Sequence, residues 1–69
     1  MSTTAEIQAL INTGAVGKEV NIIRENAVGT TTSYYCQPVR DPKARPRWVD
    51  VTNTETDATN AAAILAALV

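Results

Sequence analysis

Hydrophobic residues near the start of the chain recur at the spacing of one helix face. Ile7, Leu10 and Ile11 stand at i, i+3 and i+4, and the Thr-x-x-Glu pattern of residues 3–6 before them is typical of a capping box. We therefore expect a short helix over residues 4–13.

Three later segments have the patterns of strands, with alternating apolar and polar residues or a high content of Thr and Tyr. These segments are residues 19–26, 30–39 and 48–52. Asn and Gly indicate a turn at residues 26–29, and a polar loop with two prolines covers residues 40–47. We expect three strands that form an antiparallel meander.

The period of two assigns the side chains of the second and third strands to sheet faces. Tyr34 and Cys36 share one face, whereas Tyr35 lies on the other. One tyrosine is therefore expected in the core, and the other on the surface or in an interface. Because the chain has few large side chains, we also expect Trp48 to fill the core rather than to form a ligand site.

The last nine residues, 61–69, contain no polar side chain. They are too few to cross a bilayer, which takes about 20 apolar residues, and they predict a helix, capped by Thr54, Thr56 or Asp57, that lacks a polar face. Since a small domain has little interior in which to bury such a helix on all sides, we expect another subunit or another protein to cover it. The predicted interface residues are Ala61, Ile64, Leu65, Leu68 and Val69.

These elements predict an α+β fold, in which a small three-stranded antiparallel meander is flanked by a short N-terminal helix and an apolar C-terminal helix. The 69 residues make a single domain, 1–69. The core is expected to be small, because 11 of the apolar residues are Ala and Phe is absent. The single cysteine excludes an internal disulfide, so association with other chains is the expected source of additional stability.

The charges are unevenly distributed, although their sum is only −1. Residues 1–39 carry −1 (two cations, three carboxylates), residues 40–47 carry +3 (four cations, one carboxylate), and residues 48–69 carry −3 (three carboxylates). Such asymmetry can orient neighbouring subunits head to tail. A solvated loop is the more common explanation of a local excess of charge.

The basic loop is also the candidate contact for nucleic acid or another anion, because cations can bind phosphate while an adjacent aromatic ring stacks on a base. Against this interpretation, the sequence pI is about 5.1, whereas nucleic-acid-binding domains are typically basic. The arginines could instead pair with carboxylates of the same or a neighbouring chain. The candidate contact residues are Arg40, Lys43, Arg45, Arg47 and Trp48.

No pattern in the sequence predicts catalysis, a metal site or a cofactor. Cys36 would need a neighbouring base to act as a nucleophile, and the chain has no His; a buried thiol is the expected role. The spacings of zinc ligands and of a phosphate-binding glycine loop are missing. We expect a protein that is not an enzyme and has no small-molecule substrate. The start of the chain lacks the features of a signal peptide, so we expect a cytoplasmic or virion location.

The first functional hypothesis is a structural or interaction protein that acts as a subunit of a homo-oligomer or larger assembly. The small size and the Thr-, Ala- and Asn-rich composition are similar to those of accessory virion proteins of bacteriophages (head decoration, head–tail connection or tail parts), although no motif supports the likeness. The alternative is a small nucleic-acid-binding module that uses the 40–48 loop. A peripheral membrane anchor is disfavoured, because the C-terminal helix lacks the basic polar face typical of interfacial helices.

Overall fold

The computed structural model describes residues 4–14, 19–41 and 43–68. In them, one helix precedes and one helix follows, along the chain, a three-stranded sheet of order β1-β2-β3. Both strand pairs of this sheet are antiparallel. The prediction of an α+β fold with a meander between two helices is confirmed; the predicted capping box at residues 3–6 lies partly outside the described residues. The elements are α1 (Thr4–Gly14), β1 (Val20–Val28), β2 (Thr31–Pro38), β3 (Arg47–Thr52) and α2 (Asp57–Ala67).

The hairpin between β1 and β2 turns later in the chain than the sequence predicts. The ladder continues to the pair of Val28 with Thr31, so the turn consists of Gly29 and Thr30 rather than residues 26–29. Gly29 has a φ of 62°, a conformation that glycine adopts without steric cost. The glycine, and not the preceding asparagine, therefore sets the position of this turn.

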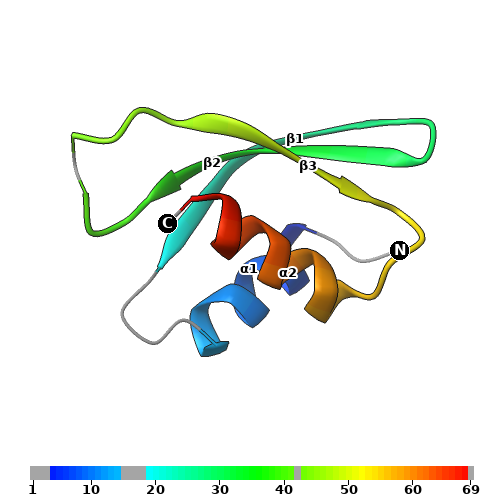
Figure 1. The fold of residues 1–69 in the computed structure, drawn as a ribbon, viewed down its shortest axis with the longest axis horizontal. Helices are drawn as coiled ribbons and strands as arrows, with labels where there is room; N and C mark the ends of the chain where they lie inside the picture. Colours follow the sequence, from blue (N-terminus) through cyan, green and yellow to red (C-terminus); the bar gives the residue numbers. More distant parts are fainter. Residues whose placement is uncertain (1–3, 15–18, 42, 69) are drawn as a thin grey trace.

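Both helices pack on the same face of the sheet and leave the other face uncovered (Figure 1). Among the described residues, the core between them contains nine buried hydrophobic side chains. Tyr34 and Cys36 are among them, with 3% and 0% of their surface exposed, which confirms their expected shared face. The full set is Ile7, Ile11, Val20, Tyr34, Cys36, Val49, Val51, Ala61 and Ile64.

Helix α2 begins at the cap residue Thr56, whose side chain accepts a hydrogen bond from the backbone N–H of Thr59. Its apolar stripe packs on the chain's own core, where Ala61 and Ile64 are buried. The buried amide of Asn60 donates to the carbonyl of Thr52 at 3.1 Å. This bond ties the helix to the end of β3, so α2 is held against its own sheet by both apolar and polar contacts.

The start of β1 is tied to α1 by a single side chain. The Gln8 amide donates from Nε2 to the Val20 carbonyl at 2.8 Å, and its Oε1 accepts from the Ile22 N–H at 2.7 Å. Immediately afterwards the ladder shifts register between Ile22 and Arg24, so Ile23 is an extra residue in β1. A bulge of this kind changes which face the following side chains occupy.

Candidate functional site: the open sheet face and the basic segment

A row of three large side chains crosses the uncovered face of the sheet, here called the open face. Arg24 on β1 is paired with Tyr35 on β2, which is paired with Trp48 on β3. The two rings have centroids 5.0 Å apart, and the Arg24 guanidinium carbon lies 5.3 Å from the Tyr35 ring centroid and 5.2 Å from that of Trp48. Arg24, Tyr35 and Trp48 together form the aromatic cluster.

The expectation that Trp48 fills the core is wrong. Trp48 is 44% exposed, because Val49 and Val51 take the helix-facing positions of β3 and alternation turns Trp48 to the opposite side. Two short helices cover only one face of the sheet (Figure 1), so this indole remains at the surface. Tyr35, on the same open face, is half-buried beside it.

The strands that carry the aromatic cluster have other exposed apolar residues and a polar contact. Ile23 at the bulge is 53% exposed, and Val28 at the end of β1 is 70% exposed. In the next row, the Ser33 hydroxyl donates to Asp50 Oδ1 at 2.6 Å. Alternation places Val28 and Asp50 on the open face with the aromatic cluster, so this face carries apolar, cationic and anionic side chains.

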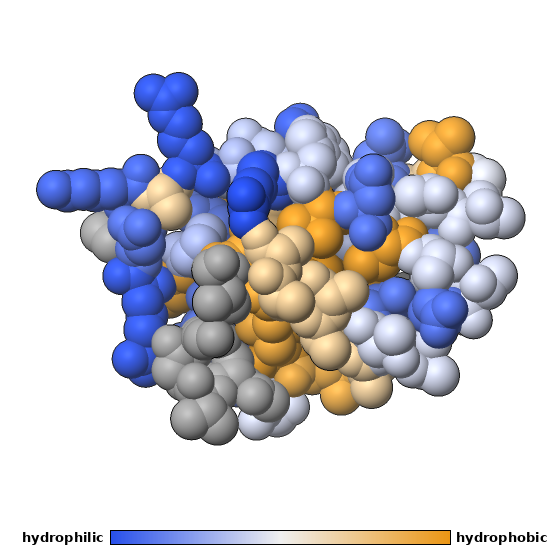
Figure 2. Space-filling view, viewed as in Figure 1, coloured by the Kyte–Doolittle hydropathy of each residue, from blue (hydrophilic) through white to orange (hydrophobic). Residues whose placement is uncertain are grey.

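The basic segment, residues 40–47, lies at one end of the molecule's long axis (Figure 1). Figure 2 shows strongly hydrophilic side chains that project from that end. Its conformation is fixed by Gln37, whose Nε2 donates to the Ala44 carbonyl at 2.8 Å, and by Asp41, whose side chain accepts from the Lys43 N–H at 3.1 Å. Local hydrogen bonds therefore hold this loop in one conformation.

The structure divides the predicted nucleic-acid contact residues between two surfaces. Arg47 is paired with the buried Cys36 and so occupies the helix-facing side of β3, whereas Trp48 lies on the open face. Arg40, Lys43 and Arg45 are exposed in the loop before β3. The sequence analysis placed all five residues in one contact surface. In the structure, Arg47 and Trp48 lie on opposite faces of β3, because side chains alternate along a strand.

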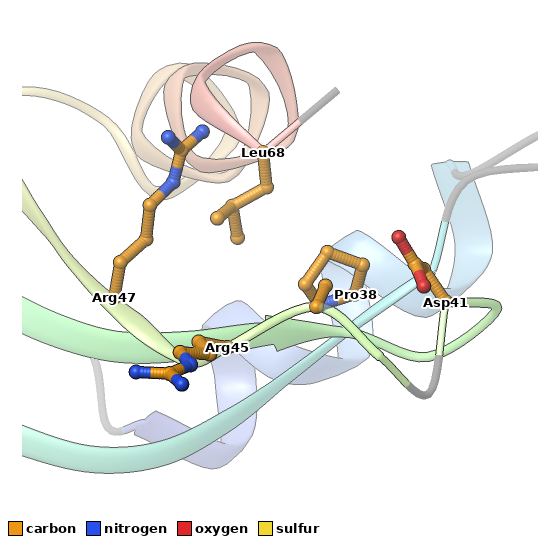
Figure 3. Close-up of a pocket in the computed structure, with 6 residues that line it drawn as sticks. Pro38, Asp41, Arg45, Arg47 and Leu68 are labelled. Carbon is orange, nitrogen blue, oxygen red and sulfur yellow. The ribbon is translucent and has the colours of Figure 1, made fainter.

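A hollow of about 250 Å³ lies between the basic segment and the end of α2. Figure 3 shows Arg47 extended toward the end of α2 beside Leu68, Pro38 between them and Asp41, and the Arg45 guanidinium turned away from Leu68. The hollow has apolar walls and two cationic side chains against one carboxylate. Its lining residues are Pro38, Asp41, Ala44, Arg45, Arg47 and Leu68.

The predicted interface on the C-terminal helix is mostly occupied by the chain itself. Ala61 and Ile64 are 5% and 0% exposed, and Leu65 and Leu68 pack partly buried against the core. Val69 lies outside the described residues. What α2 presents outward is mainly a set of exposed alanines at positions 58, 62, 63, 66 and 67.

Arg24 is the residue of the aromatic cluster that the sequence analysis missed. Strict alternation from Val20 and Ile22 would place Arg24 on the helix-facing side, and the bulge at Ile23 moves it to the open face. The signal in the sequence is the adjacent pair of isoleucines, which breaks the alternation of apolar and polar residues.

Cys36 is buried and reduced, and its burial raises the pKa of the thiol to about 11. Such a thiol is protonated at neutral pH and is a poor nucleophile. Across residues 4–14, 19–41 and 43–68, no three His, Cys, Asp or Glu side chains are grouped as they would need to be to hold a metal ion. In that same part of the chain, neither helix has the length and apolar character needed to cross a bilayer.

Comparison with known proteins gives no relative: no family model, no curated protein and no solved structure matches the chain.

Proposed function

We propose that the chain is a non-enzymatic interaction protein, a subunit of a homo-oligomer or larger assembly, and that it uses the open face of its sheet as its main contact surface. The observation that carries the proposal is the aromatic cluster of Arg24, Tyr35 and Trp48 on a sheet face that the chain's own helices leave uncovered. A bacteriophage virion is one setting for such a subunit, on the basis of composition alone.

The composition of the cluster supports a protein partner. Trp, Tyr and Arg are the residues most enriched among those that dominate binding energy at protein interfaces. They have well-defined orientations here, because each contacts the other two across the three strands. A partner would therefore meet a preformed surface and would lose less conformational entropy on binding.

A variant of Trp48 tests this proposal. We expect the wild-type chain to form a discrete oligomer in light scattering over a range of concentrations, and Trp48→Ala to require at least about tenfold higher concentration for the same association, as for an interface hot spot. Leu10→Ala is the matched control, since Leu10 is 40% exposed on α1, away from the open face, and should associate as the wild type does.

The emission of Trp48, the only tryptophan, supplies a second readout. It should shift to shorter wavelength as the oligomer forms, because the exposed indole leaves water. A wild-type chain that stays monomeric, or a Trp48→Ala variant that associates normally, would contradict the proposal.

A nucleic-acid-binding module is the second candidate, favoured by the combination of one cation and two rings on an exposed sheet with a basic segment at its end. Stacking of a base on an aromatic side chain contributes about 1–3 kcal/mol in single-strand-binding proteins. Asp50 on the same face and the net charge of −1 disfavour it. Binding of labelled single-stranded DNA that weakens with salt and is lost in Tyr35→Ala would support this candidate over the first.

A further inference from the structure

Charges of opposite sign lie at the two ends of the long axis of the molecule, which measures 32 Å. The basic segment, with four cations and one carboxylate, forms one end, and the loop between β3 and α2, which contains Glu55, lies toward the other (Figure 1). Asp57 follows in the first turn of α2. A single molecule cannot bring these two ends together, so any pairing between them requires a second copy.

The charges at each end also match the helix ends found there. Both α1 and α2 begin at the acidic end and finish at the basic end (Figure 1), where cations interact favourably with the last carbonyl groups of a helix. This general preference agrees with the sign of the charge at each end, although neither helix has a basic residue in its last turn. It does not explain why the basic end is hollowed, nor why an exposed carboxylate lies on the opposite loop.

The lining of the hollow at the basic end suits a carboxylate by its charge, because two of its residues are arginines and one is an aspartate. Arg47 extends along the hollow beside Leu68, whereas Arg45, which also lines the hollow, has its guanidinium turned away from Leu68 (Figure 3). The one carboxylate of the lining, Asp41, is turned to its own loop, where it accepts the Lys43 N–H. A guanidinium binds a carboxylate with two parallel hydrogen bonds, and the apolar walls of Pro38 and Leu68 would partly exclude water from such a pair.

Glu55 is the complementary group at the other end. It is exposed in the loop of residues 53–56, and that loop is held by hydrogen bonds of its neighbours: Asn53 donates to the carbonyls of Gly29 and Thr30 at 3.1 and 2.9 Å. The loop that carries Glu55 is therefore held to the β1–β2 turn by hydrogen bonds, which fix the position of its backbone.

We propose that copies of this chain associate head to tail, with Glu55 of one copy inserted into the hollow beside Arg47 and Arg45 of the next. The inference deepens the proposed function, since it names a second copy as the partner and adds a contact distinct from the open face. Because the two surfaces lie on different parts of the molecule, the contact is heterologous and builds a ring or a filament rather than a closed pair.

Two variants, each with one end inactivated, give the sharpest test. Glu55→Lys has an intact hollow, and the double variant Arg45→Glu/Arg47→Glu has an intact Glu55 loop. We expect each alone to associate at least about tenfold more weakly than the wild type at low salt. Mixed in equal amounts in the Trp48→Ala background, where association through the open face is weakened, they should form a 1:1 heterodimer and stop there, because each contributes one functional end. Its mass would be twice that of the 7.4 kDa chain.

Matched charge changes elsewhere serve as controls. Glu25→Lys and the double variant Arg40→Glu/Lys43→Glu alter the net charge by the same amounts at exposed positions outside the hollow and the Glu55 loop, and they should associate as the wild type does. Circular dichroism should show all variants folded. Association of the wild type should weaken as salt rises from about 0.05 M to 1 M, where the screening length falls to about 3 Å.

The outcomes separate this inference from the proposed function. If the two charge variants associate normally, or remain monomers when mixed, the head-to-tail contact is wrong, even where Trp48→Ala still disrupts the oligomer. If mixing restores a heterodimer while Trp48→Ala has no effect, the head-to-tail contact stands and the open-face proposal fails. A wild-type chain that is monomeric at low salt overturns both.

Discussion

Gln8 performs, with one side chain, the hydrogen bonding that a neighbouring strand would supply. Its amide donates to the Val20 carbonyl and accepts from the Ile22 N–H, which are two backbone groups on the free edge of β1. Asn12, one turn later in α1, accepts a further bond from the same Nε2 at 3.0 Å. The start of β1 is thereby closed to pairing with another chain, a protection that exposed sheet edges commonly require.

Replacing Gln8 by Leu should lower the free energy of unfolding by about 1–3 kcal/mol, because the Val20 carbonyl and the Ile22 N–H lose their partner in a partly buried location. Chemical denaturation followed by Trp48 fluorescence measures the change. Asn12→Ala, which removes only the exposed bond to Gln8, is the control and should cost less. Equal stabilities of Gln8→Leu and the wild type would show that water replaces the amide without loss.

Cys36 and Tyr34 make stability depend on alkaline pH. Burial raises the pKa of the Cys36 thiol from 9.0 to about 11. Burial, followed by the nearby charges of Glu25, Asp57 and Cys36, also raises the pKa of Tyr34. The folded state keeps both groups protonated at pH values where the unfolded chain releases the protons, so stability falls at alkaline pH. The contribution of the thiol is fully present below pH 9 and is lost as the pH rises from 9 toward 11.

The expected slope is about 1.4 kcal/mol per pH unit for each proton involved. Denaturation series at pH 8, 9, 10 and 11 measure it, and Cys36→Ala should give a shallower decline over the same range whatever its stability at pH 8. The same slope in both proteins would mean that the thiol does not contribute.

Residue patterns predicted the face of most strand side chains, because the period of two needs no knowledge of the tertiary structure. Tyr34 and Cys36 are buried and Tyr35 is on the other face, as expected. Trp48 was wrongly assigned to the core, since it is 44% exposed on the open face. Alternation distinguishes the two faces of a strand, but not which of them the helices will cover.

At the scale of elements, the β1–β2 hairpin depends on Gly29. Its φ of 62° is unfavourable for a residue with a side chain, while a Cβ at this position would meet nothing within 4 Å. The cost of Gly29→Ala should therefore be conformational alone, about 1 kcal/mol. Thermal unfolding measures it, and Thr30→Ala, at the adjacent turn residue with a negative φ, should be close to neutral. A neutral Gly29→Ala would show that the turn changes conformation freely.

Element boundaries were predicted to within a few residues, and the differences have physical causes. Two more residues of β1 pair with β2 than the Asn-Ala-Val-Gly sequence suggested, since the strand ends where the backbone can reverse. Helix α2 could begin at any of three residues in the sequence analysis; Thr56 is the cap because its hydroxyl accepts the Thr59 N–H. Leu10 lies on the predicted stripe of α1 but is 40% exposed, whereas Ile7 and Ile11 of the same stripe are buried in the core.

For the whole molecule, the principal difference concerns what covers the apolar C-terminal helix. The sequence analysis expected another subunit, because a helix without polar residues seemed too apolar for a small domain. The structure packs one stripe of α2 against α1 and the sheet and leaves mainly alanines outside, which expose little apolar area each. The uncovered surface that results is on the sheet, and it depends on how two helices are placed, which local patterns do not encode.

The bulge in β1 also has an evolutionary consequence. Because β1 and β2 are in regular register on both sides of the bulge, Ile23 is in effect an insertion into an otherwise continuous ladder. A relative that lacked this residue would keep every other pairing and would still place its counterpart of Arg24 on the open face. Loss of Ile22 would have the same effect, because Ile23 would then take the position opposite Cys36 that Ile22 occupies. A gap of one residue in an alignment at this point would therefore be compatible with an unchanged aromatic cluster.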